Sequence, residues 1–325
     1  MPASYFGMVL GLAGLGNAWH AAVPAWQLPA LTAEVIYLFA GLVWAGLIAL
    51  YLVKALAAPQ TLAAEAAHPV HCCFIGLAGV ATMLIAGALV PHARPLAWAL
   101  YAIGFFFTVG FAVWRTGGLW QGSRHPDTTT PVLYLPTVAG SFVAATVAAR
   151  LGHPDIGQLA FGAGMFSWLA IESVLLHRLL TSPALAVELR PTLGIQLAPA
   201  PVGAVAYLAV GTGAPDVFAH AIIGYGLLQL LVLSRLALRL AEAGAVAGLW
   251  AFSFGLTALA TAPAILVARG ETGALAALAV LLFAVANLAV GGLSFMTLKL
   301  AANARRLLPS TPPAARTDLS ARTTR

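Results

Sequence analysis

Histidine and cysteine side chains gather at one point of this chain, at the start of an apolar stretch. His68 and His71 precede the adjacent cysteines Cys72 and Cys73. Imidazole and thiolate groups are good ligands for soft and borderline cations, so this pattern could form a metal site. However, adjacent side chains on a helix point about 100° apart, and the chain has no further cysteine to complete a soft site. Small apolar packing residues are the alternative, and we expect neither a metal nor a cofactor.

A single carboxyl group, that of Glu172, lies well within an apolar stretch. An ionisable group in hydrocarbon costs free energy and often marks a proton or ion pathway, so Glu172 could be a proton-coupling site. Because Glu172 lies five and six residues before His177 and Arg178, it could instead reach the membrane interface or form a structural pair with a base of a neighbouring helix. The sequence leaves both hypotheses open. Glu34 and Asn287 are weaker candidates of the same kind.

Motifs typical of hydrolytic enzymes are absent. The chain has no Gly-x-Ser-x-Gly motif, no His-Glu-x-x-His motif and no pair of aspartates inside an apolar stretch. Its histidines lie in connections or near the ends of apolar stretches, whereas a buried membrane haem needs axial histidines well inside helices. We therefore expect no enzyme and no redox centre.

The composition is typical of a membrane protein. Its residues are 61% hydrophobic and 8% charged, with a mean hydropathy of +0.93, whereas a soluble domain carries about 25% charged residues. We expect an all-α integral membrane protein with ten transmembrane helices and tight connections. The expected spans, each end placed within about four residues, are 5–22, 30–57, 70–91, 95–115, 131–151, 155–181, 190–211, 215–239, 246–268 and 273–302.

Basic residues close every second apolar stretch at even intervals. Lys54, Arg115, Arg178, Arg239 and Lys299 are separated by 61, 63, 61 and 60 residues. Two helices and two short connections fill about 60 residues. The spacing therefore predicts five repeated helical hairpins, each beginning and ending on the same side of the membrane.

The distribution of the other basic residues orients these hairpins. The side that holds both termini carries 13 of the 16 Lys and Arg residues, and the opposite side has three. By the positive-inside rule, both termini are cytoplasmic. The charges are scattered over short loops, which argues against a nucleic-acid partner. We expect a channel domain over 1–302 and a disordered basic cytoplasmic tail over 303–325, because this tail lacks apolar periodicity.

The odd-numbered spans differ from the even-numbered ones in their small and helix-breaking residues. Examples in the odd spans are Gly14, Gly87, Pro136, Pro201 and Pro263, whereas the even spans are more uniformly bulky. Kinked backbone within a membrane is tolerated where it is buried in protein or lines a cavity. The simplest arrangement is an inner ring of five odd helices around a pore, surrounded by an outer ring of five even helices. Ordinary close packing through small residues is the alternative.

Five short segments carry a resemblance to a known family: Tyr5–Gly7, Leu133–Pro136, Phe161–Met165, Gly194–Pro199 and Gly248–Gly255. They resemble the tellurite-resistance/dicarboxylate transporter family. This family includes bacterial tellurite-resistance proteins of the TehA type, plant guard-cell slow anion channels and fungal dicarboxylate and sulfite transporters. The resemblance implies ten helices with quasi-five-fold symmetry, a pore through the inner helices, and a homotrimer with one pore per subunit in the bacterial inner membrane.

The resemblance also implies a gate. In the family a phenylalanine of the ninth span blocks the pore, and the motif Trp-Ala-Phe-Ser-Phe-Gly places it at the second phenylalanine, here Phe254. Phe252 and Phe254 point roughly 200° apart on a helix, so only one of them faces a central axis. An aromatic ring in a narrow pore is a hydrophobic barrier to ions. Packing of Phe254 between helices is the alternative.

The odd spans contain no Lys or Arg well inside them. A pore without fixed positive charge should favour anions that lose water at low cost, such as nitrate over chloride. Basic residues at the cytoplasmic rim would raise the local anion concentration modestly. We expect the pore wall to include Gly11, Leu15, Thr82, Pro136, Ser141, Gln196, Pro199, Ser253 and Thr257.

Together these features predict a gated channel for small monovalent anions such as nitrate and chloride, associated through the family with tellurite resistance. The alternative is a proton-coupled secondary transporter or exporter of dicarboxylate, sulfite or tellurite, for which Glu172 leaves room. A membrane enzyme or sensor is a more distant hypothesis. Nothing in the residues recognises a tellurium oxyanion.

Overall fold

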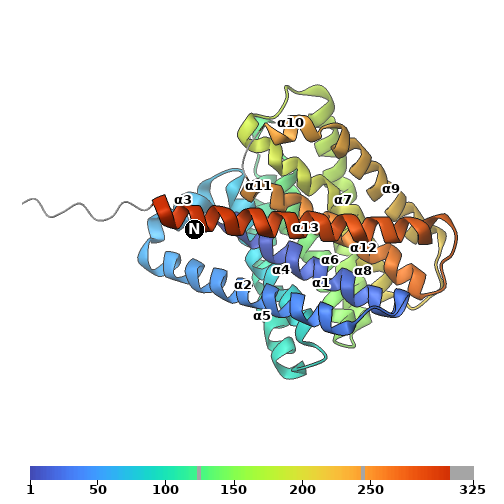
Figure 1. Ribbon diagram of the computed structural model, residues 1–325. Coiled ribbons are helices and arrows are strands. Elements are labelled where there is room, and N and C mark those ends of the chain that lie inside the picture. The colour runs from blue at the N-terminus through green and yellow to red at the C-terminus, as the bar shows by residue number, and fades with distance from the viewer. Residues whose placement is uncertain (123–125, 243–245, 308–325) are drawn as a thin grey trace, which may run out of the picture.

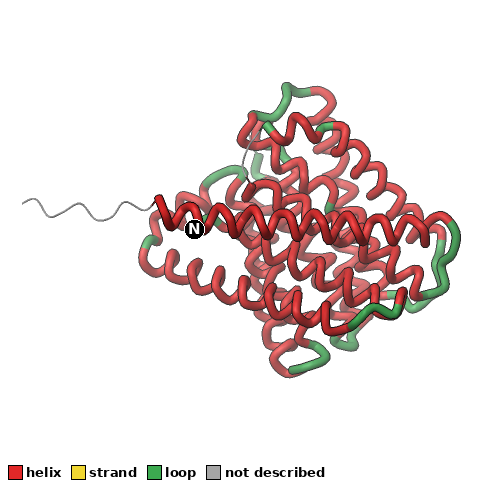
Figure 2. The backbone as a smooth tube through the Cα atoms, in the orientation of Figure 1, coloured by secondary structure: helices red, strands yellow, loops and turns green. Residues whose placement is uncertain are grey.

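The computed structural model describes residues 1–122, 126–242 and 246–307, and within these ranges the chain is helical and has no strand (Figures 1 and 2). Ten helical segments of this part are long and apolar enough to cross a membrane, as expected. All their ends lie within five residues of the expected ones. The spans are Ala3–Trp26, Ala30–Ala57, His71–Leu89, Arg94–Trp120, Pro131–Arg150, Pro154–Thr181, Val187–Val210, Val217–Arg235, Trp250–Ala268 and Ala274–Asn303.

The even-numbered spans are continuous α-helices. They are α2 (Ala30–Ala57), α5 (Arg94–Trp120), α7 (Pro154–Thr181), α9 (Val217–Arg235) and α13 (Ala274–Leu307). Since α13 runs to Leu307, the helix continues five residues past the expected end of the membrane domain, and the remainder of the expected tail lies outside the described residues. Arg124, one of the 13 basic residues expected on the cytoplasmic side, also lies outside the described residues.

The odd-numbered spans begin with a short irregular helix before the regular one. The pairs are η1 (Ala3–Tyr5) with α1 (Phe6–Trp26), η2 (His71–Gly76) with α4 (Leu77–Leu89), η4 (Pro131–Leu133) and η5 (Leu135–Ala139) with α6 (Gly140–Arg150), η6 (Val187–Leu197) with α8 (Pro199–Val210), and η7 (Trp250–Phe252) with α12 (Ser253–Ala268). The connections hold α3 (Pro59–Ala67), η3 (Pro126–Thr128), α10 (Ala237–Ala241) and α11 (Val246–Leu249).

Proline explains part of this irregularity. Pro136 lies in the π-helical turn η5 and Pro191 lies inside the 3₁₀ helix η6. Because proline has no N–H and crowds the preceding turn, an ideal α-helical hydrogen-bond pattern cannot continue through it. At the opposite ends, tight turns follow α6 and α12, where Gly152 and Gly270 have φ angles of 93° and 96°. Glycine adopts these angles without steric cost.

The odd and even spans differ sharply in burial. In the most apolar stretch of each span, 67–83% of the residues are buried in the odd spans, against 17–33% in the even ones. The even helices instead expose large apolar side chains, one example each being Leu42, Phe106, Leu169, Leu231 and Leu288. Exposed apolar faces of this length suit contact with lipid, and the ten spans identify a multi-pass membrane protein.

Small residues bring the buried helices close together. Helix α1 packs against α4, α4 against α6, α6 against α8, α8 against α12, and α12 against α1. A β-carbon added to Gly14 would lie 2.2 Å from Thr257 Oγ1, and one added to Gly255 would lie 2.9 Å from the backbone nitrogen of Ala198. Glycine therefore permits backbone approaches that any larger residue would prevent.

Hydrogen bonds of tryptophan side chains attach outer helices to buried ones. Each indole N–H donates to a polar side chain of the neighbouring helix across the contact, where little water is available to compete. The pairs are Trp44 with Thr82 at 3.0 Å, Trp19 with Asn287 at 2.8 Å, and Trp250 with Thr297 at 3.0 Å.

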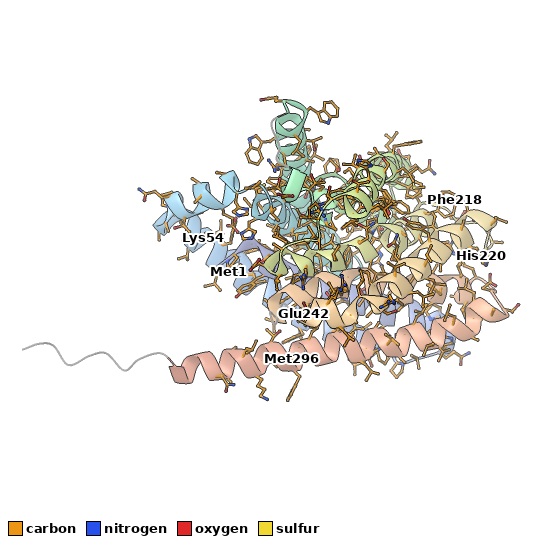
Figure 3. The ribbon with its side chains drawn as sticks, turned by 90° about the horizontal axis from the view of Figure 1, so that it is seen from above. Met1, Lys54, Phe218, His220, Glu242 and Met296 are labelled. Atoms are coloured by element: carbon orange, nitrogen blue, oxygen red, sulfur yellow. The ribbon has the colours of Figure 1, made fainter. Side chains whose placement is uncertain are left out.

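Three of the regularly spaced basic residues bind neighbouring chain segments. Lys54 forms a 2.5 Å ion pair with Glu65 and donates a 3.2 Å hydrogen bond to the carbonyl oxygen of Met1. Figure 3 shows Met1 and Lys54 toward one end of the molecule. Arg115 and Arg178 each donate a 2.9 Å hydrogen bond to a loop carbonyl oxygen. These basic residues therefore fasten helix ends to loops.

Candidate functional site

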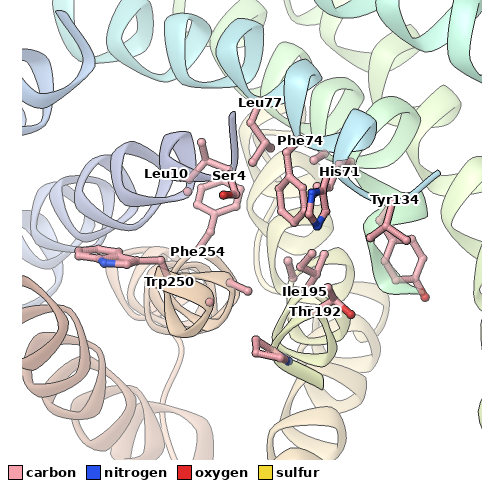
Figure 4. A pocket seen from close by; sticks show the side chains of 18 of the residues that line it. Ser4, Leu10, His71, Phe74, Leu77, Tyr134, Thr192, Ile195, Trp250 and Phe254 are labelled. Carbon is pink, nitrogen blue, oxygen red and sulfur yellow. The ribbon is translucent and has the colours of Figure 1, made fainter. Parts of the chain in front are cut away.

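A cavity of about 330 Å³ lies among the N-terminal ends of the five buried spans (Figure 4). Each span contributes to its wall, with Gly7, Phe74, Tyr134, Thr192 and Trp250 as one example from each. Most of the wall is apolar. Among the described residues that line this cavity there is no Lys or Arg, while two carboxyl groups, those of Glu65 and Glu188, are present.

A second, much smaller cavity lies further along the same five spans. Its volume is about 20 Å³, which is enough for roughly one water molecule. Again every buried span contributes, with Gly14, Leu84, Thr146, Val205 and Thr261 as examples. In each span, the residue named for the smaller cavity lies C-terminal to the residue named for the larger one.

Phe254 lies between these two cavities. It lines both of them, and Val202 is the other described residue that does so. The side chain is 9% exposed, and a β-carbon added to Gly14 of the neighbouring helix would lie 3.2 Å from its ring. Figure 4 shows the ring beside Leu10, at the edge of the larger cavity. Phe254 and Val202 are therefore the two described residues that border both cavities.

Phe252 points elsewhere. A β-carbon added to Gly194 would lie 2.5 Å from a ring carbon of Phe252, so this ring packs against η6 of the seventh span. It lines neither cavity within the described residues. The two phenylalanines of the motif thus face different neighbours, as their separation on a helix requires.

Three of the expected wall residues lie at the contact between α1 and α12. Ser253 and Thr257 are fully buried, and their hydroxyl groups donate to the backbone carbonyl oxygens of Trp250 at 2.7 Å and of Phe254 at 3.0 Å. Gly11 lies against Ser253. These residues set the position of α12, and therefore of Phe254, without lining either cavity.

The other expected wall residues are placed differently. Thr82 donates to a backbone carbonyl oxygen within α4 at 2.8 Å, Gln196 donates to Glu172, and Ser141 packs against Gly164 of α7. Leu15 and Pro136 are buried without lining either cavity. Of the nine wall residues expected besides the gate, the structure places Pro199 on the wall of the larger cavity.

Most of the wall consists of apolar residues that the sequence did not mark. Examples are Leu10, Leu77, Val138 and Ile195, each near the N-terminal end of its buried helix. No residue type distinguishes them from ordinary core residues. Their shared position along the spans could have indicated them, because each lies within the irregular start of its span or shortly after it.

Glu172 is buried and accepts four hydrogen bonds. The indole N–H of Trp168 and the amide of Gln196 each donate at 2.8 Å, and the hydroxyl of Tyr225 donates at 2.5 Å. The hydroxyl of Tyr134 donates to it as well. One of the two hypotheses from the sequence was a structural pair with a base. These four partners are uncharged and come from the fifth, sixth, seventh and eighth spans. These directed donors satisfy the hydrogen-bonding capacity of the buried carboxyl group without a paired base.

The histidine and cysteine cluster forms no recognisable metal centre. The sulfur atoms of Cys72 and Cys73 lie 4.0 Å apart and are buried, while the rings of His68 and His71 stack at a centroid distance of 4.0 Å. Within the described residues no three His, Cys, Asp or Glu side chains come together to hold a metal ion. Burial, together with the neighbouring His71 ring, lowers the pKa of His68. His71 lines the larger cavity.

Comparison with known proteins identifies the family of the chain. Residues 1–298 match the SLAC1 family, described as voltage-dependent anion channels. The chain is 37% identical over 299 residues to the tellurite resistance protein TehA homolog of Haemophilus influenzae, an alignment that covers 92% of this chain and 90% of that protein. It is 26% identical over 220 residues to the guard cell S-type anion channel SLAC1 of Arabidopsis thaliana, covering 63% of this chain and 39% of that protein. With ten apolar spans and matches along almost its whole length, the chain belongs to the SLAC1/TehA family of membrane anion channels and transporters.

Proposed function

We propose that this protein is a gated channel that conducts small monovalent anions through the centre of its five buried spans, and that Phe254 is the gate. The observation that carries this proposal is the position of the Phe254 ring. It lies between two cavities, each lined by all five buried spans. A phenyl ring at such a point offers an ion no partner to replace its lost water.

The order of helix contacts supports an inner ring of odd helices around the path and an outer ring of even helices. The contacts run from α1 through α4, α6, α8 and α12 and return to α1. The large difference in burial between odd and even spans fits the same arrangement. Each even helix follows its odd partner in the chain, which is consistent with five hairpins.

The chemistry of the wall supports selection of anions by the cost of dehydration. The described wall of the larger cavity has no fixed positive charge, and the Lys54 ammonium group compensates Glu65 at 2.5 Å. The N-terminal ends of five buried helices meet there, and each carries a partial positive charge. Because no fixed positive charge on the wall holds an anion, the cost of dehydration should decide which anion passes, and nitrate should pass more readily than chloride.

The setting of this channel follows from the same features. We place it in the bacterial inner membrane with both termini in the cytoplasm, because 13 of the 16 basic residues lie on that side of the spans. We further propose a homotrimer with one path per subunit, in which part of the apolar faces of the even helices contacts a neighbouring subunit and the rest contacts lipid. The name of the Haemophilus relative makes tellurite an ion to be tested.

Recording from purified protein in planar bilayers tests the proposal. Nitrate, chloride and malate are compared on both sides of the membrane, with protein-free bilayers as the control. We expect unitary currents carried by nitrate and chloride, and a reversal potential that does not change with the sodium gradient. Equal permeability to sodium would reject anion selection. Transport of malate or tellurite coupled to protons, without unitary currents, would instead support the transporter alternative.

A further inference from the structure

We propose that Glu172 stays ionised and acts as a positioning residue, which holds Tyr134 and Gln196 behind the wall of the conducting path. Its role is thus to fix the shape of the larger cavity, and it carries no proton across the membrane. The effect on current rests on the proposed function. The ionisation of Glu172 can be tested independently.

The hydrogen bonds fill the acceptor capacity of an ionised carboxylate. Such a group has about four lone-pair sites, and here each oxygen accepts two donors. Gln196 and Tyr225 donate to Oε1, while Tyr134 and Trp168 donate to Oε2. A proton on either Glu172 oxygen would have an acceptor only if the hydroxyl group of Tyr134 or Tyr225 changed from donor to acceptor. The four donors therefore occupy all the lone-pair sites of the carboxyl group and leave none for a proton.

The amide of Gln196 supports the same assignment. Its nitrogen donates to Glu172 at 2.8 Å, whereas its own oxygen is buried without a hydrogen-bond partner among the described residues. Reversing the amide would place its oxygen against a carboxylate oxygen. The accepting oxygen of Glu172 therefore sets the orientation of this side chain, at the cost of one unsatisfied acceptor.

The carboxylate reaches the cavity through Tyr134. The Tyr134 side chain lines the larger cavity and is 1% exposed, and Figure 4 shows its hydroxyl on the side of the ring away from Phe254. Since the hydroxyl is bound to Glu172, the ring is held with its apolar face toward the cavity. Without this bond the Tyr134 ring can turn into the path. The ring then narrows the path, and its hydroxyl adds a polar group to the wall.

Single-channel recording with a double-mutant cycle tests the positioning role. Glu172→Gln, Tyr134→Phe and the double variant are compared in a Phe254→Ala background, in which the path is open. Unitary nitrate conductance is a property of each folded molecule, so a variant that merely folds less well leaves it unchanged. The matched control is Glu34→Gln, which alters an exposed carboxyl group paired with a histidine on another surface.

We expect each single variant to lower the unitary conductance by about three- to tenfold. The double variant should lower it no further than Glu172→Gln alone, because both changes break the same link. The control should change it by less than about twofold. Unchanged conductance in Glu172→Gln, or multiplied effects in the double variant, would overturn the positioning role.

Infrared difference spectra, recorded from about pH 5 to 8, test the charge of Glu172 directly. We expect no protonated carboxyl band that disappears in Glu172→Gln. Appearance of such a band in the wild-type protein would overturn the inference and point to proton coupling. Absence of current in Phe254→Ala would instead count against the proposed channel, while the infrared result would still decide whether Glu172 is ionised.

Discussion

Replacement of Phe254 by alanine should open the path between the two cavities. The phenyl ring is in contact with both of them, and its removal joins a space of about 330 Å³ to one of about 20 Å³. Alanine keeps the helical backbone of α12 intact. The change should therefore remove the proposed barrier while leaving the rest of the wall in place.

The size of the effect follows from the water that an ion can keep. At the ring, the smaller cavity has room for about one water molecule, so an ion passing Phe254 must lose nearly all of its hydration. The space left by the ring lets at least one more water stay on the anion, and a hydrogen bond to a charged group is worth about 1.5–3 kcal/mol. Because 1.36 kcal/mol corresponds to a factor of ten in rate, the unitary nitrate conductance should rise about 10- to 150-fold.

Phe252→Ala provides the matched control for this experiment. It removes the same group from the same motif, but its ring packs against Gly194 and lies outside both cavities. Both variants are recorded as purified protein in planar bilayers with symmetric nitrate. The reasoning is refuted if Phe254→Ala leaves the unitary conductance unchanged, or if Phe252→Ala raises it to the same extent.

Two further predictions concern stability. Gly255→Ala should destabilise the fold by about 1–3 kcal/mol, because its new methyl group would lie 2.9 Å from the rigid backbone at Ala198. Gly162→Ala, with open space around it, should be neutral or stabilising. Equal midpoints of thermal unfolding for these two variants would contradict the prediction. Burial raises the pKa of Glu65, but hydrogen bonds from a backbone N–H and from Lys54 outweigh burial and hold the pKa below its ordinary value. The stabilisation is therefore complete above the ordinary carboxyl pKa and is lost as the pH falls through the lowered one. The Glu65→Gln variant should lack this acid-dependent loss of stability. An acid-unfolding profile equal to that of the wild type would contradict the prediction.

The spans could be predicted from the sequence because each depends on its own run of apolar residues. The expected second span, 30–57, coincides with Ala30–Ala57. The stronger burial of the odd spans also followed from their Gly and Pro content. The irregular starts of the odd spans were not predicted. A proline indicates that a helix is interrupted, but the neighbouring helices decide whether a π or a 3₁₀ turn results.

The wall could not be predicted from polarity. Thr82, Ser253 and Thr257 were expected there as donors, yet each hydroxyl donates to a backbone carbonyl three or four residues earlier in the chain. Away from water, a hydroxyl group satisfies itself with the nearest acceptor. A sequence does not distinguish such a hydroxyl from one that faces an ion.

Glu172 shows a second limit of sequence analysis. Its apolar surroundings marked it correctly as unusual, but three of its donors lie 24, 38 and 53 residues away along the chain. Nothing local indicates that Tyr134, Gln196 and Tyr225 meet at one carboxylate. That meeting depends on how four different spans pack.

The contact between α1 and α12 has a consequence for the biosynthesis of the protein. Gly14 lies against Thr257, which a ribosome adds 243 residues later. At about 5–20 residues per second, this takes roughly 12–50 s. During that interval the first helix, which has the lowest hydropathy of the ten spans at 1.2, waits in the membrane with its glycine face uncovered. The interval is long enough for an insertase or chaperone to hold this face, and the chain cannot complete its assembly until its ninth span has been inserted.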